Sequence, residues 1–278
     1  MIEVFFLVVL GILWLTFASV SDLKFKEVPN WLCFSLIVFG LGVRFFYSLF
    51  SNDFNFLYQG IFGLGIFFLI GNMLYYARFF AGGDAKLLIA LGVILPFGNS
   101  FFENLNIFLW WFILFFISGA VYGLGATIFF TVRDFKKIKK EFVHVFKKNK
   151  SYFWCFLILF GIFLGISFIE KLFLVLGIFS LLGFLFYVYG KAIEESSMVR
   201  DVRVKDLREG DWLYTDLRLG GKILASNWEG LSNKEIALIK KHKKFVKIRQ
   251  GIAFVPVFWI SFFGFIVLYF LGYFFKLF

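Results

Sequence analysis

The sequence contains apolar runs that are too long and too numerous for a soluble domain. Eight runs are bounded by charged or turn-forming residues, near 4–20, 31–50, 57–79, 84–98, 107–132, 152–168, 171–190 and 252–276. A helix needs about 20 apolar residues to cross the hydrocarbon core of a bilayer. Of all residues, 61% are hydrophobic and 17% are charged, whereas soluble proteins are about 45–50% apolar and about 25% charged. We therefore expect an all-α polytopic membrane protein with about eight transmembrane helices.

The positions of lysine and arginine predict the orientation of these helices. Of the 29 basic residues, 8 lie in 133–150 and 14 in 191–250. Positive charge collects in cytoplasmic loops, so both segments are expected inside, which with eight spans puts the N-terminus outside. The start Met1-Ile2-Glu3 has no basic region and no cleavage site of small residues, so the first run is expected to be retained as a helix.

The fourth run is short for a crossing, because only about 14 residues from Ala85 to Phe97 are apolar. Without it, however, the basic 133–150 segment would lie on the opposite side of the membrane from Lys24 and Lys26. We therefore keep this run as a span.

The chain is expected to have five parts. These are a catalytic membrane core over 1–132, a basic cytoplasmic loop over 133–150, two spans over 151–190, a cytoplasmic module over 191–250 and a C-terminal span over 251–278.

The 191–250 segment is predicted to form a small α+β module. Ser232 to Glu235 reads S-x-x-E, a capping box that opens a helix to about Lys244. Residues 211–214 and 222–224 are expected as short strands separated by a turn at Gly220-Gly221. With 14 basic and 9 acidic residues, the module suits contact with anionic lipid head groups. The alternative is a basic loop with no specific partner.

Little in the sequence indicates a cofactor, a metal or nucleic acid. Cys33 and Cys155 lie far apart within apolar runs and form no CxxC pair, which argues against a thiolate metal site. The net charge of +11 follows from the basic loops and requires no nucleic-acid partner. No cofactor motif is found.

Two aspartates on the inner side stand out among the acidic residues. Asp22 ends the first predicted helix and Asp84 begins the fourth, so both carboxylates are expected at one depth near the cytoplasmic face. Ionisable groups inside a membrane protein are costly and are functional candidates. The alternative is that Asp84 only caps its helix and Asp22 only marks the interface with water.

A pair of aspartates a few ångströms apart has a definite chemistry, because the two carboxylates cannot both ionise and must share a proton. One can deprotonate an attacking water while the other protonates the carbonyl oxygen. The helix ends favour Asp84 as the anion and Asp22 as the acid. This is the logic of an aspartic peptidase.

The surroundings of both aspartates resemble a known family. Asp22, five residues and then Val28-Pro29-Asn30 form one motif, and Gly82-Gly83-Asp84-Ala85-Lys86-Leu87-Leu88 forms the other. Both resemble motifs of the type IV prepilin peptidases, and especially of the archaeal prepilin and preflagellin peptidases, which are membrane aspartic peptidases of the GxGD type. One departure is Ala81, which stands where the first glycine of GxGD is expected.

This resemblance implies an endopeptidase with Asp22 and Asp84 as catalytic residues and Gly82, Gly83 and Lys86 in the surrounding motif. It implies cleavage, at the cytoplasmic face, of the short basic leader of pilin-like or archaellin precursors. It implies neither zinc nor the methyltransferase activity of the bacterial enzymes, since the paired CxxC motifs are missing.

Several alternatives remain open from the sequence. Glu27 either meets the lysines of a leader or is simply solvated, and Arg78 either pairs with Asp84 or extends to the interface. Another GxGD-type intramembrane protease, a transporter that uses the aspartates as a relay, and a membrane scaffold are competing functions. The sequence leaves the oligomeric state undetermined.

Overall fold

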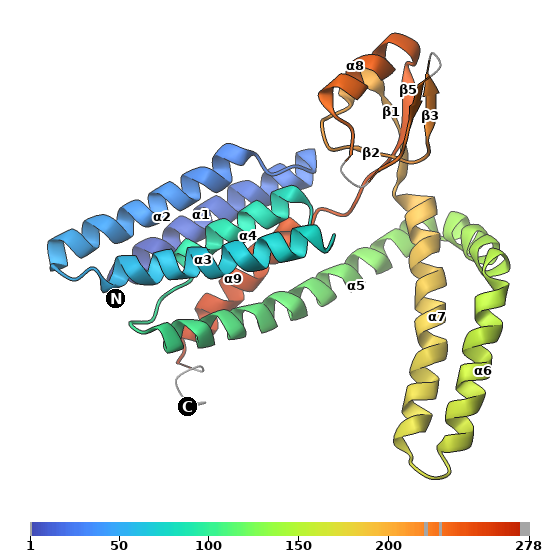
Figure 1. Cartoon of the computed structure of the whole chain (residues 1–278), viewed down its shortest axis with the longest axis horizontal. Coiled ribbons are helices and arrows are strands. Elements are labelled where there is room, and N and C mark those ends of the chain that lie inside the picture. The colour runs from blue at the N-terminus through green and yellow to red at the C-terminus, as the bar shows by residue number, and fades with distance from the viewer. Residues whose placement is uncertain (1, 220–221, 228–229, 273–278) are drawn as a thin grey trace. The chain divides into compact units, whose positions relative to one another are not determined.

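The fold is taken from a computed structural model that describes residues 2–219, 222–227 and 230–272 (Figure 1). The chain forms two compact units. Unit 1 comprises Met1–Leu124 and Ala253–Phe278, and unit 2 comprises Gly125–Ile252.

Unit 1 is built from helices. They are α1 (Ile2–Phe25), α2 (Asn30–Ser51), α3 (Asn55–Tyr76), α4 (Gly82–Ile94), the first part of α5 (Phe101–Lys148) and α9 (Val255–Phe270). Unit 2 contains the rest of α5, followed by α6 (Lys150–Ile166), α7 (Leu172–Ser197) and a small module of strands.

A helix lies at each of the eight predicted runs, so the expected helical membrane architecture is confirmed. Within the described residues, α1, α2, α3, α5 and α7 are both long and apolar enough to cross a membrane. Helices α6 and α9 are apolar but have only 17 and 16 residues. The doubtful fourth run forms α4, with 13 residues or about 20 Å.

Helix α4 is short and is surrounded by other parts of the protein. Most of its residues are buried, namely Ala85, Leu87, Leu88, Ala90, Leu91, Gly92, Val93 and Ile94. A helix end at membrane depth is tolerated only where protein satisfies its free backbone groups. Helix α4 is therefore a core element of unit 1.

Glycines let α3 and α4 approach closely. A Cβ atom on Gly92 would lie 2.6 Å from the carbonyl oxygen of Gly63, and one on Gly71 would lie 2.8 Å from Ile89 Cγ1. Small residues at such crossings allow helix backbones to pack within a membrane. Aromatic rings of Phe67 and Trp111 pack beside this crossing, with ring centroids 5.7 Å apart.

Helix α5 differs from the sequence-based expectation, because most of the predicted 133–150 loop is helical. Its backbone leaves helical geometry at Asp134 (φ −115°, ψ 26°) and then continues as a helix to Lys148. Ile138 and Val145 lie seven residues apart on one face, and both are buried against residues of α7. This apolar stripe explains why the lysine-rich segment is a helix.

The module of strands comprises β1 (Val199–Arg203), the 3₁₀ turn η1 (Val204–Asp206), β2 (Trp212–Leu213), β3 (Leu217–Leu219), β4 (Lys222–Leu224), α8 (Asn233–His242) and β5 (Phe245–Arg249). It begins later than position 191, because α7 continues to Ser197. Strand β5 lies between β1 and β2, with antiparallel pairing on both sides. Ile239 of α8 and Ile248 of β5 are part of its apolar core.

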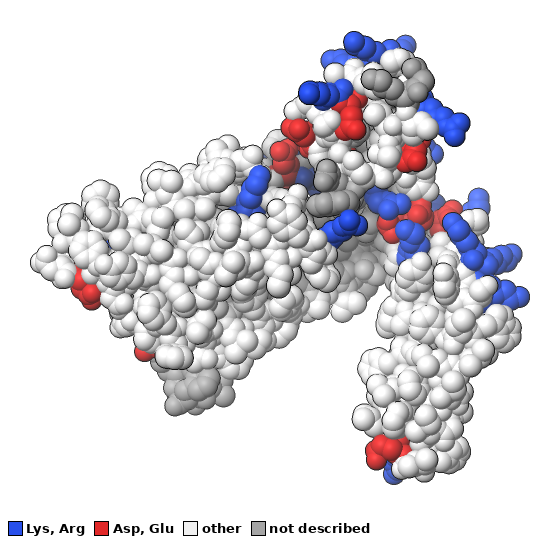
Figure 2. All heavy atoms as spheres, in the orientation of Figure 1, with Lys and Arg blue, Asp and Glu red and all other residues white. Residues whose placement is uncertain are grey.

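The predicted capping box is present, since Ser232 and Glu235 exchange hydrogen bonds at the start of α8. The two predicted strands exist, but they are not partners: β4 pairs with β3, whereas β2 pairs with β5. The expected turn at Gly220-Gly221 lies outside the described residues. Figure 2 shows lysine and arginine side chains gathered over unit 2, whereas the visible face of unit 1 is largely uncharged.

Candidate active site

Asp22 lies near the end of α1 and is only 7% exposed. Its Oδ2 accepts a 2.9 Å hydrogen bond from the backbone N–H of Val255, the first residue of α9. That N–H has no partner within its own helix, so Asp22 satisfies a free donor of α9. The position of Asp22 at the end of α1, which favours it as the acid, does not by itself indicate this donor.

The loop after Asp22 is shaped by local backbone geometry. Lys26 adopts a left-handed conformation (φ 57°), and its N–H donates to the carbonyl oxygen of Asp22 at 2.8 Å, which ends α1. The Ser21 hydroxyl donates to the carbonyl oxygen of Glu27 at 2.9 Å. Pro29, in extended conformation, precedes α2. As a result Val28 is turned inward and buried.

Asp84 lies in the first turn of α4, directly after Gly82 and Gly83. A Cβ atom on Gly83 would lie 3.4 Å from Val28 Cβ, so the start of α4 packs directly on the loop that follows Asp22. The Lys86 Nζ donates a 2.7 Å hydrogen bond to Asn30 Oδ1. The two sequence motifs therefore meet at two separate contacts.

The two motifs also bring their carboxyl groups together. Asp22 and Asp84 are close enough for their charges to interact. A shared proton between two such groups permits paired acid and base chemistry.

Two further side chains lie near this pair, and neither belongs to the two sequence motifs. The Cys33 thiol is buried and lies within electrostatic range of Asp84 and Lys86. The Tyr122 hydroxyl lies within electrostatic range of Asp22. Cys33 comes three residues after Asn30, a spacing that places both on one face of α2. This spacing is the sequence signal that Cys33 lies beside the first motif. No local signal indicates Tyr122.

The remaining candidate residues lie at the surface. Glu27 is exposed, as expected of a solvated carboxylate. Arg78 is exposed and has a left-handed backbone (φ 63°). Across the described part of the chain, no group of three or more His, Cys, Asp and Glu side chains is arranged to hold a metal ion.

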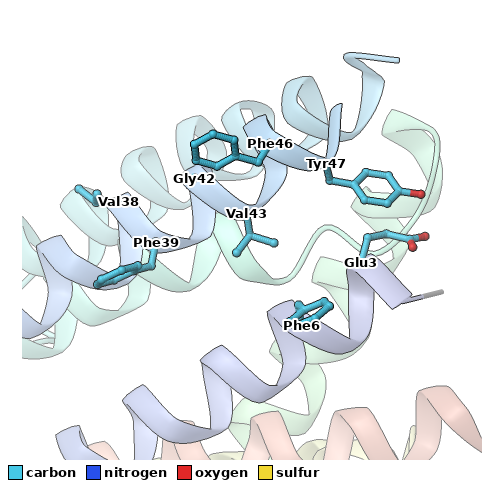
Figure 3. A pocket seen from close by; sticks show the side chains of 8 residues that line it. All are labelled: Glu3, Phe6, Val38, Phe39, Gly42, Val43, Phe46 and Tyr47. Carbon is cyan, nitrogen blue, oxygen red and sulfur yellow. The ribbon is translucent and has the colours of Figure 1, made fainter. Parts of the chain in front are cut away.

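A groove of about 560 Å³ opens elsewhere in unit 1, between α1 and α2 (Figure 3). It is lined by Glu3, Phe6, Val38, Phe39, Gly42, Val43, Phe46 and Tyr47. Glu3 begins α1, whereas Asp22 lies near its other end. A helical rise of 1.5 Å per residue separates these ends by nearly 30 Å, so the groove is distinct from the aspartate pair.

Comparison with known proteins identifies the region that carries the pair. Residues 9–128 match the type IV leader peptidase family. The matched region includes both aspartate motifs, so the resemblance inferred from them is confirmed.

Individual leader peptidases are similar over a shorter region. A preflagellin peptidase of Methanocaldococcus jannaschii is 32% identical over 88 residues, which cover 32% of this chain and 37% of the relative. A preflagellin peptidase of Methanococcus maripaludis is 34% identical over 88 residues, covering 32% of this chain and 38% of the relative. A prepilin peptidase (EppA) of Methanothermobacter thermautotrophicus is 41% identical over 85 residues, covering 30% of this chain and 22% of the relative.

The matches thus span less than two fifths of the length of these leader peptidases. No solved structure matches the chain. Helix α9, which donates the N–H group to Asp22, lies outside the region that matches the family.

Proposed function

We propose that this protein is an aspartic endopeptidase that removes the short basic leader of pilin-like or archaellin precursors. The observation that carries the proposal is the meeting of two motifs more than fifty residues apart. Contacts between Val28 and Gly83 and between Asn30 and Lys86 bring Asp22 and Asp84 within electrostatic range. The leader peptidase match and the names of the relatives support the same activity.

In the proposed reaction the two carboxyl groups share one proton. The charged carboxylate takes a proton from a water molecule as the water oxygen attacks the scissile carbonyl carbon. The protonated carboxyl group gives its proton to the carbonyl oxygen. When the C–N bond breaks, the leaving nitrogen takes the proton that the pair received from the water. As the new carbonyl group forms, a hydroxyl group of the tetrahedral intermediate gives its proton to the other carboxylate, so that the pair again holds one proton.

The surrounding residues orient this pair. The Val255 N–H fixes the rotation of the Asp22 carboxyl group, since it donates to one of its two oxygens. The Lys86–Asn30 hydrogen bond holds the first turn of α4 against α2. A Cβ atom on Gly83 would be in ordinary van der Waals contact with Val28, so the start of α4 lies beside the loop that precedes α2.

The proposed cleavage takes place at the cytoplasmic side. The support comes from the charge distribution, because 22 of 29 basic residues lie in 133–150 and 191–250 and basic segments remain inside. With the N-terminus outside, Asp22 near the end of α1 lies at the same inner face. A precursor cut just before its hydrophobic segment would present the scissile bond at this depth.

The test is cleavage of a short-leader pilin precursor in membranes that contain the full chain. Asp22→Asn and Asp84→Asn should each reduce the cleavage rate by about 10²–10⁴, which is the usual contribution of acid–base catalysis. Asp206→Asn is the control, because it removes a carboxylate that is paired with Arg203 in the strand module. It should cleave at the native rate.

Retained cleavage in either Asp22→Asn or Asp84→Asn would contradict the assignment of the pair. Failure of the native chain to cut a panel of precursors would favour the transporter or scaffold alternatives over a peptidase.

A further inference from the structure

Arg44 of α2 is a fully buried cation in unit 1, with 0% of its surface exposed. Its described hydrogen bonds all run to backbone carbonyl oxygens. Nε donates to Val93 at 2.8 Å, Nη1 donates to Phe56 at 2.8 Å, and Nη2 donates to Pro96 at 2.6 Å. The guanidinium carbon also lies 4.4 Å from the centre of the Phe56 ring.

These carbonyl groups explain what the guanidinium does. Val93 lies in the last turn of α4 and Pro96 lies just beyond its end. The last four carbonyl groups of a helix have no partner within the helix, and the hydrocarbon core of a membrane offers no water to replace one. Arginine presents several N–H donors in a fixed plane, and a positive charge is favourable at a helix C-terminus.

Gly60 of α3 provides the space for this side chain. A Cβ atom at Gly60 would lie 2.7 Å from Arg44 Nε and would overlap Arg44 Cδ. Alanine at position 60 would therefore displace the guanidinium without changing the charge of the protein.

Helix α2 also contacts the opposite end of α4, through the Asn30–Lys86 hydrogen bond. The start of α2 thus meets the start of α4, and Arg44 reaches its end, so the two helices run in parallel. Because α4 is a single short helix, a shift at its C-terminal end moves Asp84 at its N-terminal end.

We infer that Arg44 is a positioning residue that fixes α4, and with it Asp84, against the loop that carries Val28. The catalytic part of this inference rests on the proposed peptidase function. The positional part does not, because it concerns only where the first turn of α4 lies.

The positional part is tested by a cross-link that needs no cleavage activity. Cβ atoms at Val28 and Gly83 would lie 3.4 Å apart, close to the separation found in disulfides. In the full chain with Cys33→Ser and Cys155→Ser, the Val28→Cys/Gly83→Cys pair should therefore oxidise readily. Adding Arg44→Gln or Gly60→Ala should reduce the cross-linked fraction severalfold.

Gly65→Ala is the matched control, since Gly65 lies in the same helix and a Cβ there meets no atom within 4 Å. It should leave the cross-link unchanged. The inference is overturned if the Arg44→Gln and Gly60→Ala chains cross-link as readily as the control. Two variants are used so that the test can still be made if one of them fails to insert into the membrane.

The catalytic part is tested by cleavage kinetics in the chain with its native cysteines. A misplacement of about 1 Å can cost about 10²-fold in rate, so kcat should fall at least tenfold in Arg44→Gln and Gly60→Ala, with little change in KM. A rise in KM of similar size, with kcat unchanged, would overturn positioning as the role of Arg44. If the native chain cuts no precursor, the proposed function fails, while the cross-link still decides the position of α4.

Discussion

The close crossing of α3 and α4 makes Gly63→Ala a demanding test of the packing in unit 1. A Cβ atom at position 63 would overlap the carbonyl oxygen of Gly92 and would lie 2.6 Å from Pro96 Cγ. One neighbour is backbone and the other is a proline ring, so neither can rotate away. To bring the Cβ atom and the Gly92 carbonyl oxygen to the 3.0 Å below which real Cβ contacts essentially never fall, the helices would have to separate by about 0.8 Å.

The size of the effect follows from two opposing contributions. Overpacking of this kind costs about 1–3 kcal/mol, whereas alanine in place of glycine in a helix gains about 0.8–1 kcal/mol. Gly65→Ala gains helix propensity without overpacking, because a Cβ atom at position 65 meets no atom within 4 Å. The Gly65→Ala protein should therefore be more stable than the Gly63→Ala protein by at least about 1 kcal/mol.

The assay is unfolding of the purified full chain in mixed micelles, titrated with sodium dodecyl sulfate and followed by circular dichroism. Comparing the two alanine variants with each other cancels the helix-propensity gain that they share. Equal midpoints for the two proteins would refute the close crossing. Since α4 carries Asp84, the proposed peptidase activity should also be lower in the Gly63→Ala protein than in the Gly65→Ala protein.

Two further predictions concern unit 2. The Tyr214 hydroxyl donates a 2.6 Å hydrogen bond to Glu195 Oε2, and this bond raises the pKa of the phenol. The stabilisation is therefore complete below the ordinary tyrosine pKa of about 10 and is lost as the pH rises through the higher folded value. Thermal unfolding between pH 8 and pH 11, an interval set around that value of about 10, should show a smaller loss of stability for Tyr214→Phe than for the native protein, and parallel curves would contradict this. Ser232→Ala removes the capping box of α8 and should destabilise the strand module by about 0.5–2 kcal/mol. Faster amide exchange in α8 would report this, and an unchanged exchange rate would argue against the cap.

The membrane helices were predictable because burial in lipid imposes a local composition on each crossing. The run from 31 to 50 contains long apolar stretches, and it forms α2 from Asn30 to Ser51. The cap of α8 was also predictable from the sequence, since Ser232 and Glu235 form hydrogen bonds with each other within one turn. The charge of the lysine-rich segment after Arg133 predicts a loop, whereas Ile138 and Val145 give this segment a buried face that makes it a helix.

Part of the candidate site is predictable from the sequence, and part depends on contacts between residues that are far apart in the chain. Asp22 and Asp84 were identified from two short motifs, since each motif combines a carboxylate with residues that set the local backbone, such as Pro29 and Gly83. The contact of Asp22 with Val255 joins residues more than two hundred positions apart, and no local pattern encodes it. The proximity of Tyr122 to Asp22 likewise depends on how α5 packs in unit 1.

Sequence alone therefore determined that this chain is helical and suited to a membrane, and which two carboxylates are candidates for catalysis. Those properties depend on composition and on short motifs. Only the tertiary structure decided why α4 can end within unit 1 and what holds it there. Arg44 reads as an unfavourable charge within an apolar run, and its role emerges only when α4 presents carbonyl groups that lack partners in their own helix. The physical reason is that a buried polar group is tolerated only through its partners, and those partners lie far away in the sequence.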